Sequence, residues 1–165
     1  MALQPAAKTM LSDLELLIEP ADDIYGLYTG LANAAAHLYG ATERINWLGF
    51  YLVAPADGAH PGRHLVLGPF MGLPACTSIG PGKGVCGKAV MEDSVQRIAD
   101  VHDFPGHIAC DAASRSELVV PLHNPAGEVV AVLDIDSPEP GRFSVEDAEV
   151  FLQAARILEG RLFAS

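Results

Sequence analysis

Two apolar segments joined by a short polar turn limit what this chain can fold into more than any other feature. Leu118–Leu122 and Val129–Ile135 flank the turn HNPAGE, whose proline and glycine are typical of tight turns. The pattern predicts an antiparallel β-hairpin. Asp134 and Asp136 are two positions apart in the second segment, so on a strand both side chains point to one face. The apolar residues beside them then point to the opposite layer.

Hydrophobic spacing predicts the other elements. A first helix is expected behind a Ser12–Glu15 capping box and before Pro20, and a second from Asp22 to Tyr39. A last helix is expected after Ser144, which Asp147 would help to cap. The order of helices and strands predicts an α+β fold, a central antiparallel sheet with helices packed on it. The remaining expected segments are strands at Ile45–Val53, Leu65–Phe70, Ala75–Ile79 and Val95–Ile98, and a helix at about Val85–Met91.

Size and charge restrict the function classes. The 165 residues are half apolar, which suits one domain over residues 1–165 with a single sizeable core. The net charge of −11 repels phosphate backbones and anionic lipid headgroups, so neither nucleic acid nor a membrane surface is expected as a partner. The N-terminal residues lack the pattern of a secretion signal, and no apolar run is long enough to span a membrane. A cytoplasmic protein is expected.

The chain has three cysteines, Cys76, Cys86 and Cys110, in segments rich in glycine and proline. None lies in a regular apolar helix stripe, so all three are expected to be accessible. An odd count without a secretion signal argues against a structural disulfide framework. The pattern favours thiol redox chemistry, and buried inert thiols are the alternative.

A zinc site formed by the cysteines with His102 and His107 is a further alternative. Structural zinc sites nearly always contain a close Cys-x-x-Cys pair, which the chain lacks, so we expect no metal. The dinucleotide-binding pattern G-x-G-x-x-G is matched by Gly82, Gly84 and Gly87. These glycines follow hairpin strands, whereas the pattern should follow the first strand of a βαβ unit. These glycines are more consistent with a turn that opens a helix carrying Cys86. A helix N-terminus would stabilise the thiolate of that cysteine.

The predicted hairpin also gathers acidic residues. Glu117 begins one strand and Asp136 ends the next, so the two are expected to lie near one another and near Asp134. Like charges held close in a partly apolar pocket raise at least one carboxyl pKa. One carboxyl could then donate a proton while another stays anionic. The alternative is that Glu117 is solvated and Asp136 caps the turn before Pro138.

Several segments together resemble the free methionine-(R)-sulfoxide reductase family. They are NWLGFYL, LVLGPFMGLPAC, GKGVCGKAV, VQRIADVHDFPGHIACDAASRSELVVPL and AVLDIDS, and the resemblance spans about Ile45 to Phe143. The resemblance implies a single GAF domain with the terminal helices on one face of the sheet and pocket-forming loops on the other. The chain departs from the family pattern at Met71, Leu73 and Arg115 and in the long loop from Ala54 to His64.

The resemblance also implies residue roles. Cys110 occupies the catalytic position, Cys76 that of the principal resolving thiol, and Cys86 that of an auxiliary thiol. The substrate-binding positions are occupied by Glu117, Asp134, Asp136 and Trp47.

The implied reaction is reduction of free methionine (R)-sulfoxide through a Cys110 sulfenic acid and a Cys76–Cys110 disulfide. Thioredoxin would reopen the disulfide, with electrons from NADPH through thioredoxin reductase. The implied chemistry needs neither a metal nor a bound organic cofactor. A GAF-type sensor that binds a small ligand without catalysis is the alternative function, and the sequence leaves open whether the chain is a monomer or a homodimer.

Overall fold

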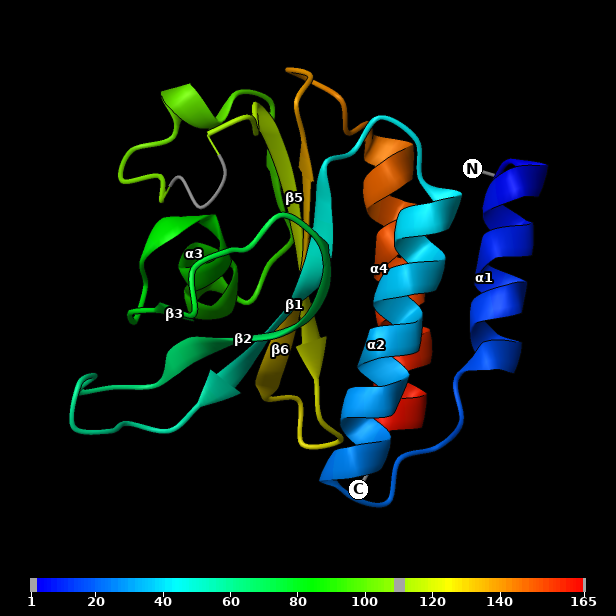
Figure 1. Ribbon diagram of the computed structural model, residues 1–165, viewed down its shortest axis with the longest axis horizontal. Helices are drawn as coiled ribbons and strands as arrows, with labels where there is room; N and C mark the ends of the chain where they lie inside the picture. The colour runs from blue at the N-terminus through cyan, green and yellow to red at the C-terminus, as the bar shows by residue number, and fades with distance from the viewer. Residues whose placement is uncertain (1–2, 109–111, 165) are drawn as a thin grey trace.

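The computed structural model describes residues 3–108 and 112–164, and the expectations for Cys110 therefore lie outside the described residues. Within these ranges the chain forms helices at both ends and strands between them (Figure 1). The helical elements are α1 (Pro5–Leu17), α2 (Ile24–Ala41), α3 (Gly84–Glu92), η1 (Val101–Asp103) and α4 (Val145–Leu162). The strands are β1 (Trp47–Ala54), β2 (His64–Gly72), β3 (Ser78–Ile79), β4 (Gln96–Ile98), β5 (Ser116–His123) and β6 (Val129–Ser137).

The strands form one sheet in the order β3-β2-β1-β6-β5-β4, and each neighbouring pair is antiparallel. The predicted hairpin of β5 and β6 is confirmed, with Leu118 opposite Ile135 and Val120 opposite Leu133. β1 lies on the other side of β6, so the two longest hairpins meet at the centre of the sheet. The predicted α+β class with a central antiparallel sheet is therefore confirmed.

The sheet separates two apolar cores. α2 and α4 cover one face, with α1 packed outside them, and α3 lies on the other face (Figure 1). Leu133 and Ile135 of β6 point into the helical core, while Val132 belongs to the core under α3. This alternation is the period of two that a strand imposes. It places the neighbouring acidic side chains of β6 on the α3 face.

The helix starts differ in part from the predicted ones. α1 begins at Pro5, so Ser12 lies inside the helix and the predicted capping box at Ser12 is wrong. Proline is favoured in the first helical turn, where its missing N–H leaves no backbone partner unsatisfied, and this allows the helix to begin a full two turns earlier. The capping box of α4 is confirmed, because Ser144 and Asp147 each accept a hydrogen bond from the other's backbone N–H.

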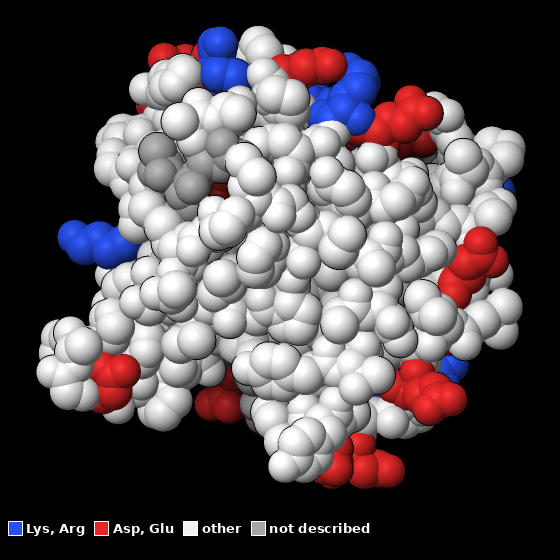
Figure 2. All heavy atoms as spheres, viewed as in Figure 1, with Lys and Arg blue, Asp and Glu red and all other residues white. Residues whose placement is uncertain are grey.

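The surface carries its charge in scattered positions. Figure 2 shows Asp and Glu side chains mostly around the rim of this view, with a centre formed largely by other residues. The net charge of −11 is therefore spread over several elements and does not form one block on this face. None of the helices in residues 3–108 and 112–164 has the length and apolar character that a membrane span requires.

Candidate functional site

Glu117, Asp134 and Asp136 meet on the α3 face of the sheet. Glu117 of β5 pairs with Asp136 of β6, and Val119 pairs with Asp134. Glu117 and Asp134 are each only 6% exposed, so the alternative of a solvated Glu117 is wrong. Asp136 lies within β6 and is half-buried. The predicted convergence of the three acids is confirmed.

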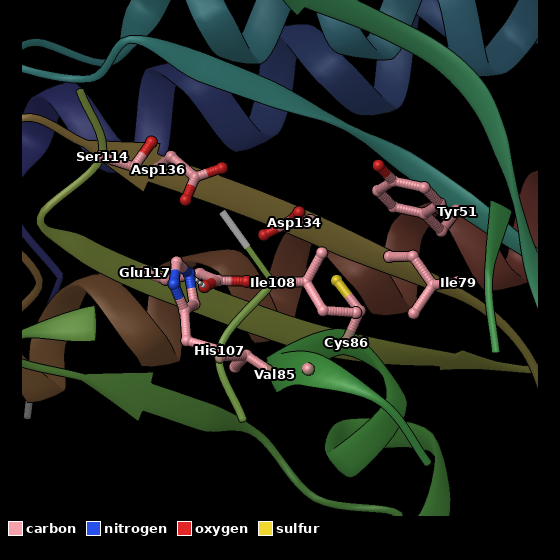
Figure 3. Close-up of a pocket in the computed structure, with 11 residues that line it drawn as sticks. Tyr51, Ile79, Val85, Cys86, His107, Ile108, Ser114, Glu117, Asp134 and Asp136 are labelled. Carbon is pink, nitrogen blue, oxygen red and sulfur yellow. Dashed lines mark ion pairs between the residues drawn. The ribbon is translucent and has the colours of Figure 1, made fainter. Parts of the chain in front are cut away.

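The acids face a small cavity of about 30 Å³, which we call the acid cavity. Figure 3 shows Asp134 and Asp136 projecting from one side, Glu117 and His107 from another, and Cys86 from α3. Apolar side chains form the remaining walls of the cavity. The described residues around it are Tyr51, Ile79, Gly84, Val85, Cys86, His107, Ile108, Ser114, Glu117, Asp134 and Asp136.

Burial controls the protonation of two of these acids. It raises the pKa of Glu117 well above its ordinary value, and the nearby charge of Asp136 raises it further. The pKa of Asp134 is also raised by burial and then by the charge of Glu117. The two carboxyls are hydrogen-bonded to one another, which requires a proton on one of them. One proton is therefore shared between Asp134 and Glu117.

Cys86 lies in the first turn of α3, as predicted, but it is only 3% exposed. The expectation that it is accessible is therefore wrong. It is a free thiol, and burial followed by the charge of Asp134 raises its pKa well above the ordinary value. The predicted stabilisation of its thiolate by the helix N-terminus is outweighed, because desolvation and three nearby carboxyls all oppose a negative sulfur.

Cys76 lies on the loop between β2 and β3, where it is half-buried and disulfide-bonded. Its backbone carbonyl accepts a hydrogen bond of 3.0 Å from the Tyr51 hydroxyl, which connects this loop to β1 and to the wall of the acid cavity. Burial, together with the nearby acids, raises the pKa of Tyr51, so the hydroxyl remains a neutral donor. The predicted pairing of Cys76 with Cys110 stays a prediction.

Trp47 is opposite Asp136 on β1, but it is not among the described residues that line the acid cavity. Its indole N–H donates to the Leu73 carbonyl at 3.0 Å, and its ring stacks on Phe70 with centroids 5.3 Å apart. The six-membered part of the ring lies over Gly49, where an added Cβ would be 2.6 Å from it. Its predicted role in substrate binding stays a prediction.

Three residues at the acid cavity were not predicted as site residues from the sequence: Tyr51, His107 and Ser114. His107 Nε2 lies 3.6 Å from Glu117 Oε2, and burial lowers the pKa of this histidine. A neutral imidazole beside a buried carboxyl can pass or hold a proton. The sequence marked His107 only as a candidate zinc ligand, because its contact with Glu117 joins a loop to a strand through the tertiary fold.

Cys86, Glu117 and Asp134 offer ligand atoms that all lie within 4.8 Å of one another. Metal binding would require the three groups to be deprotonated. Burial raises the pKa of each, and side-chain hydrogen bonds already join Asp134 to Cys86 and to Glu117. This donor set therefore suits a shared proton better than a metal ion.

Comparison with known proteins identifies relatives of this chain. The GAF domain family model matches residues 21–159. The free methionine-R-sulfoxide reductase of Escherichia coli is 51% identical over 129 residues, which cover 78% of this chain and 73% of that protein. The reduced form of the Staphylococcus aureus fRMsr superposes with a TM-score of 0.85 at 40% identity and covers 98% of this chain and 99% of its own.

A third match is a substrate complex. The free methionine-R-sulfoxide reductase of Neisseria meningitidis in complex with its substrate gives a TM-score of 0.83 at 38% identity, and covers 98% of this chain and 92% of that one. The predicted GAF fold is confirmed by the matching model and structures. The chain belongs to the free methionine-R-sulfoxide reductase family of GAF domains.

Proposed function

We propose that this protein reduces free L-methionine (R)-sulfoxide to L-methionine. The observation that carries the proposal is the pair of buried, hydrogen-bonded carboxyls, Glu117 and Asp134, whose raised pKa values keep a transferable proton at the acid cavity. Reduction of a sulfoxide must place a proton on the departing oxygen, and a protonated carboxyl supplies one near neutral pH. The names of the relatives in E. coli and N. meningitidis support the same activity.

The acid cluster also explains why the substrate would be the free amino acid. Asp134 and Glu117 share a proton, so the three-acid group retains negative charge near Asp136. A free amino acid carries an α-ammonium group that this charge would attract, whereas methionine within a peptide lacks that group. The cluster would thus bind the ammonium and protonate the oxygen at adjacent positions.

The proposed chemistry begins at Cys110, assigned from the sequence. Its thiolate attacks the sulfoxide sulfur, and the protonated carboxyl of the Asp134–Glu117 pair donates its proton to the oxygen. The oxygen passes to Cys110, which becomes a sulfenic acid, and methionine leaves as the thioether. The substrate sulfur gains two electrons and the cysteine sulfur loses two, so the step is balanced.

Cys76 is proposed as the resolving thiol. It would attack the Cys110 sulfenic acid, release water and form a disulfide, which an external dithiol then reduces. We propose thioredoxin for this role, supplied with electrons by NADPH through thioredoxin reductase in the cytoplasm. The disulfide state of Cys76 and its position beside Tyr51 of the cavity wall support a redox role for this residue.

Substrate entry would require the cavity to widen. The acid cavity measures about 30 Å³, which is roughly the volume of one water molecule. A methionine sulfoxide is several times larger. The side chains of His107 and Ile108, which come from a loop and not from the sheet, are the described walls best placed to move outward (Figure 3).

Methionine release provides the decisive test. The reduced enzyme is mixed with free methionine (R)-sulfoxide without any external reductant, and methionine is measured by chromatography. We expect about one methionine per enzyme from the wild type and from Cys76→Ser, and none from Cys110→Ser. With thioredoxin, thioredoxin reductase and NADPH, only enzymes that retain both Cys110 and Cys76 should turn over efficiently. Cys86→Ser should remain active, because the buried neutral Cys86 is a poor nucleophile.

The controls separate this proposal from a ligand sensor. N-acetylmethionine sulfoxide has no ammonium group and should react at least about tenfold more slowly than the free amino acid, in line with the loss of one charge-assisted contact. Binding of methionine sulfoxide without methionine release by the reduced wild type would contradict catalysis and favour the sensor. Full activity in Cys110→Ser would contradict the proposed nucleophile.

A further inference from the structure

A second cluster of polar side chains lies in the loop between β1 and β2. Asp57, His60 and His64 offer ligand atoms that all lie within 4.8 Å of one another. The loop is at the tip of the β1–β2 hairpin, on the lower left of Figure 1, on the opposite side of the sheet from α1, α2 and α4. None of the three residues is among those described around the acid cavity.

Local hydrogen bonds hold Asp57 and His60 together. Asp57 Oδ1 accepts from the backbone N–H groups of Ala59 at 2.9 Å and His60 at 2.7 Å, and the backbone N–H of Asp57 donates to the His60 carbonyl at 2.9 Å. His64 is fixed independently, because it is the first residue of β2 and pairs with Ala54 of β1. Two of the three side chains are thus positioned by a turn and the third by a strand.

His64 is the buried member of the cluster, and its two ring nitrogens have different surroundings. It is only 5% exposed, and its Nδ1 is buried with no hydrogen-bond partner among the described atoms. Its other nitrogen, Nε2, lies 3.4 Å from Asp57 Oδ2. The unpaired Nδ1 marks a missing hydrogen-bond partner such as a water molecule, while Nε2 is the nitrogen that faces Asp57 and could bind an ion.

The distances match those of a metal site. Zinc binds imidazole nitrogen at about 2.0–2.1 Å and carboxylate oxygen at about 2.0–2.2 Å, so two ligands at octahedral or tetrahedral angles lie about 2.8–3.6 Å apart. His60 Nδ1 is 3.1 Å from Asp57 Oδ1, and His64 Nε2 is 3.4 Å from Asp57 Oδ2. The two histidines approach different oxygens of Asp57, so an ion held by both carboxylate oxygens could bind with little change in those two separations.

For both imidazoles to bind the same ion, only a side-chain conformation has to change. The rings are stacked with centroids 4.0 Å apart and planes inclined by 13°. A rotation of the His60 ring, whose side chain is 22% exposed, would turn its nitrogen toward the ion bound by His64. His64 Nδ1 would then carry the ring proton. A cavity of about 20 Å³ beside His64 and Gly80 has room for the water molecule that would accept it.

We propose that Asp57, His60 and His64 bind one divalent transition-metal ion of the Zn²⁺ class, which fastens the β1–β2 loop to the start of β2. Two imidazoles and one carboxylate suit zinc and its neighbours in the first transition row, whereas Ca²⁺ and Mg²⁺ prefer oxygen ligands. Water would complete the coordination on the open side, where Asp57 is exposed. The site departs from the expectation of a metal-free protein and is separate from the cysteine-based zinc set considered above.

The fastened loop would also support the element that carries Cys86. A Cβ at Gly62 would be 3.3 Å from Pro81, so the loop contacts the turn that precedes α3. Metal binding stabilises the folded state by mass action when the unfolded chain binds the ion less well. We therefore expect zinc to raise the melting temperature without being needed for catalysis.

Metal-ion binding tests the proposal. The protein is untagged, in its oxidised form and treated with a chelator beforehand. Zn²⁺ is titrated in competition with a chromophoric chelator, and Co²⁺ is added separately to record its visible absorption. We expect one ion per chain, a Co²⁺ spectrum with no thiolate charge-transfer band, and a melting temperature raised by Zn²⁺. His60→Asn and Asp57→Asn should each weaken Zn²⁺ binding by at least about tenfold and remove the thermal shift.

A matched control comes from a similar pair elsewhere. His102 Nδ1 lies 3.2 Å from Asp100 Oδ1, and no second imidazole joins this pair among the described groups. His102→Asn should therefore leave Zn²⁺ affinity unchanged. Circular dichroism establishes that each variant is folded, and His60 is used first because its partly exposed side chain is less important for packing than His64. No stoichiometric binding to the folded wild type, or equal affinity in wild type and His60→Asn, would overturn the proposal.

Discussion

Glu117 and Asp136 lie directly opposite one another on the paired strands β5 and β6. Like charges at facing positions of an antiparallel pair repel, and burial of Glu117 adds a desolvation penalty to that repulsion. The chain tolerates the arrangement because the site retains a proton, which Asp134 shares with Glu117. The same relationship that makes the site unfavourable for charge makes it useful as a proton donor.

Stability should fall as pH rises above the ordinary range of carboxyl titration. Glu117 and Asp134 have raised pKa values in the folded state, so the folded protein binds more protons than the unfolded one above about pH 4. The free energy of unfolding should decrease by about 1.4 kcal/mol per pH unit for each extra proton retained, until the pH passes the folded-state pKa. Glu117→Gln should reduce this slope and be more stable than wild type at pH 8, as urea denaturation at several pH values would measure.

The control for this prediction is an exposed acid far from the site. Asp13 lies on the exposed side of α1, and Asp13→Asn should leave the pH dependence unchanged. An unchanged slope in Glu117→Gln would mean that the carboxyl is already ionised in the folded protein. An unchanged slope in both Glu117→Gln and Asp134→Asn would contradict the shared proton and the proton-donor role.

Cys86 should react slowly with alkylating reagents in the folded protein. Burial and the nearby acids raise the pKa of its thiol, and each unit of increase lowers the thiolate fraction about tenfold. Iodoacetamide labelling followed by mass spectrometry at pH 8 should modify Cys86 at least about tenfold more slowly in native protein than in urea. Equal rates in the two conditions would contradict the buried, neutral thiol.

Gly49 should be intolerant of substitution. A Cβ at this position would be 2.3 Å from Phe70 Cβ and 2.6 Å from the Trp47 ring, so Gly49→Ala forces the stacked aromatics apart. Overpacking of this kind costs about 1–3 kcal/mol of stability. Gly160→Ala is the matched control, because Gly160 lies in α4 with nothing within 4 Å of an added Cβ. That control should gain about 0.5–1 kcal/mol, and thermal unfolding of both variants would test the difference in sign.

The two serines that precede acidic residues should respond differently to alanine. Ser144 caps α4 through the reciprocal bonds with Asp147, and its loss should cost about 1 kcal/mol. Ser12 lies inside α1 and is exposed, so Ser12→Ala should be neutral or slightly stabilising, since alanine is the better helix former. Chemical denaturation would measure the free energy of unfolding of both alanine variants. A larger loss at Ser12 would contradict the observed start of α1.

The sequence alone determined the local elements and the convergence of the acids. The alternation around Asp134 and Asp136 depends only on the period of a strand, and the HNPAGE turn places Glu117 beside Asp136. Sequence failed at the start of α1, where Ser12 matches a capping box by letter but Pro5 already begins the helix. A local motif is only one of several competing starts, and packing against the helical core selects among them.

The tertiary structure determined the burial and the electrostatic surroundings of the site residues. Cys86 stands at a helix N-terminus as predicted, yet its pKa rises because α3 is packed against three carboxyls of the sheet. His107 likewise reaches Glu117 only because its loop folds over the strands. Protonation depends on burial and on charges brought together from distant parts of the chain. Those quantities arise from packing and are not contained in the order of residues along any one segment.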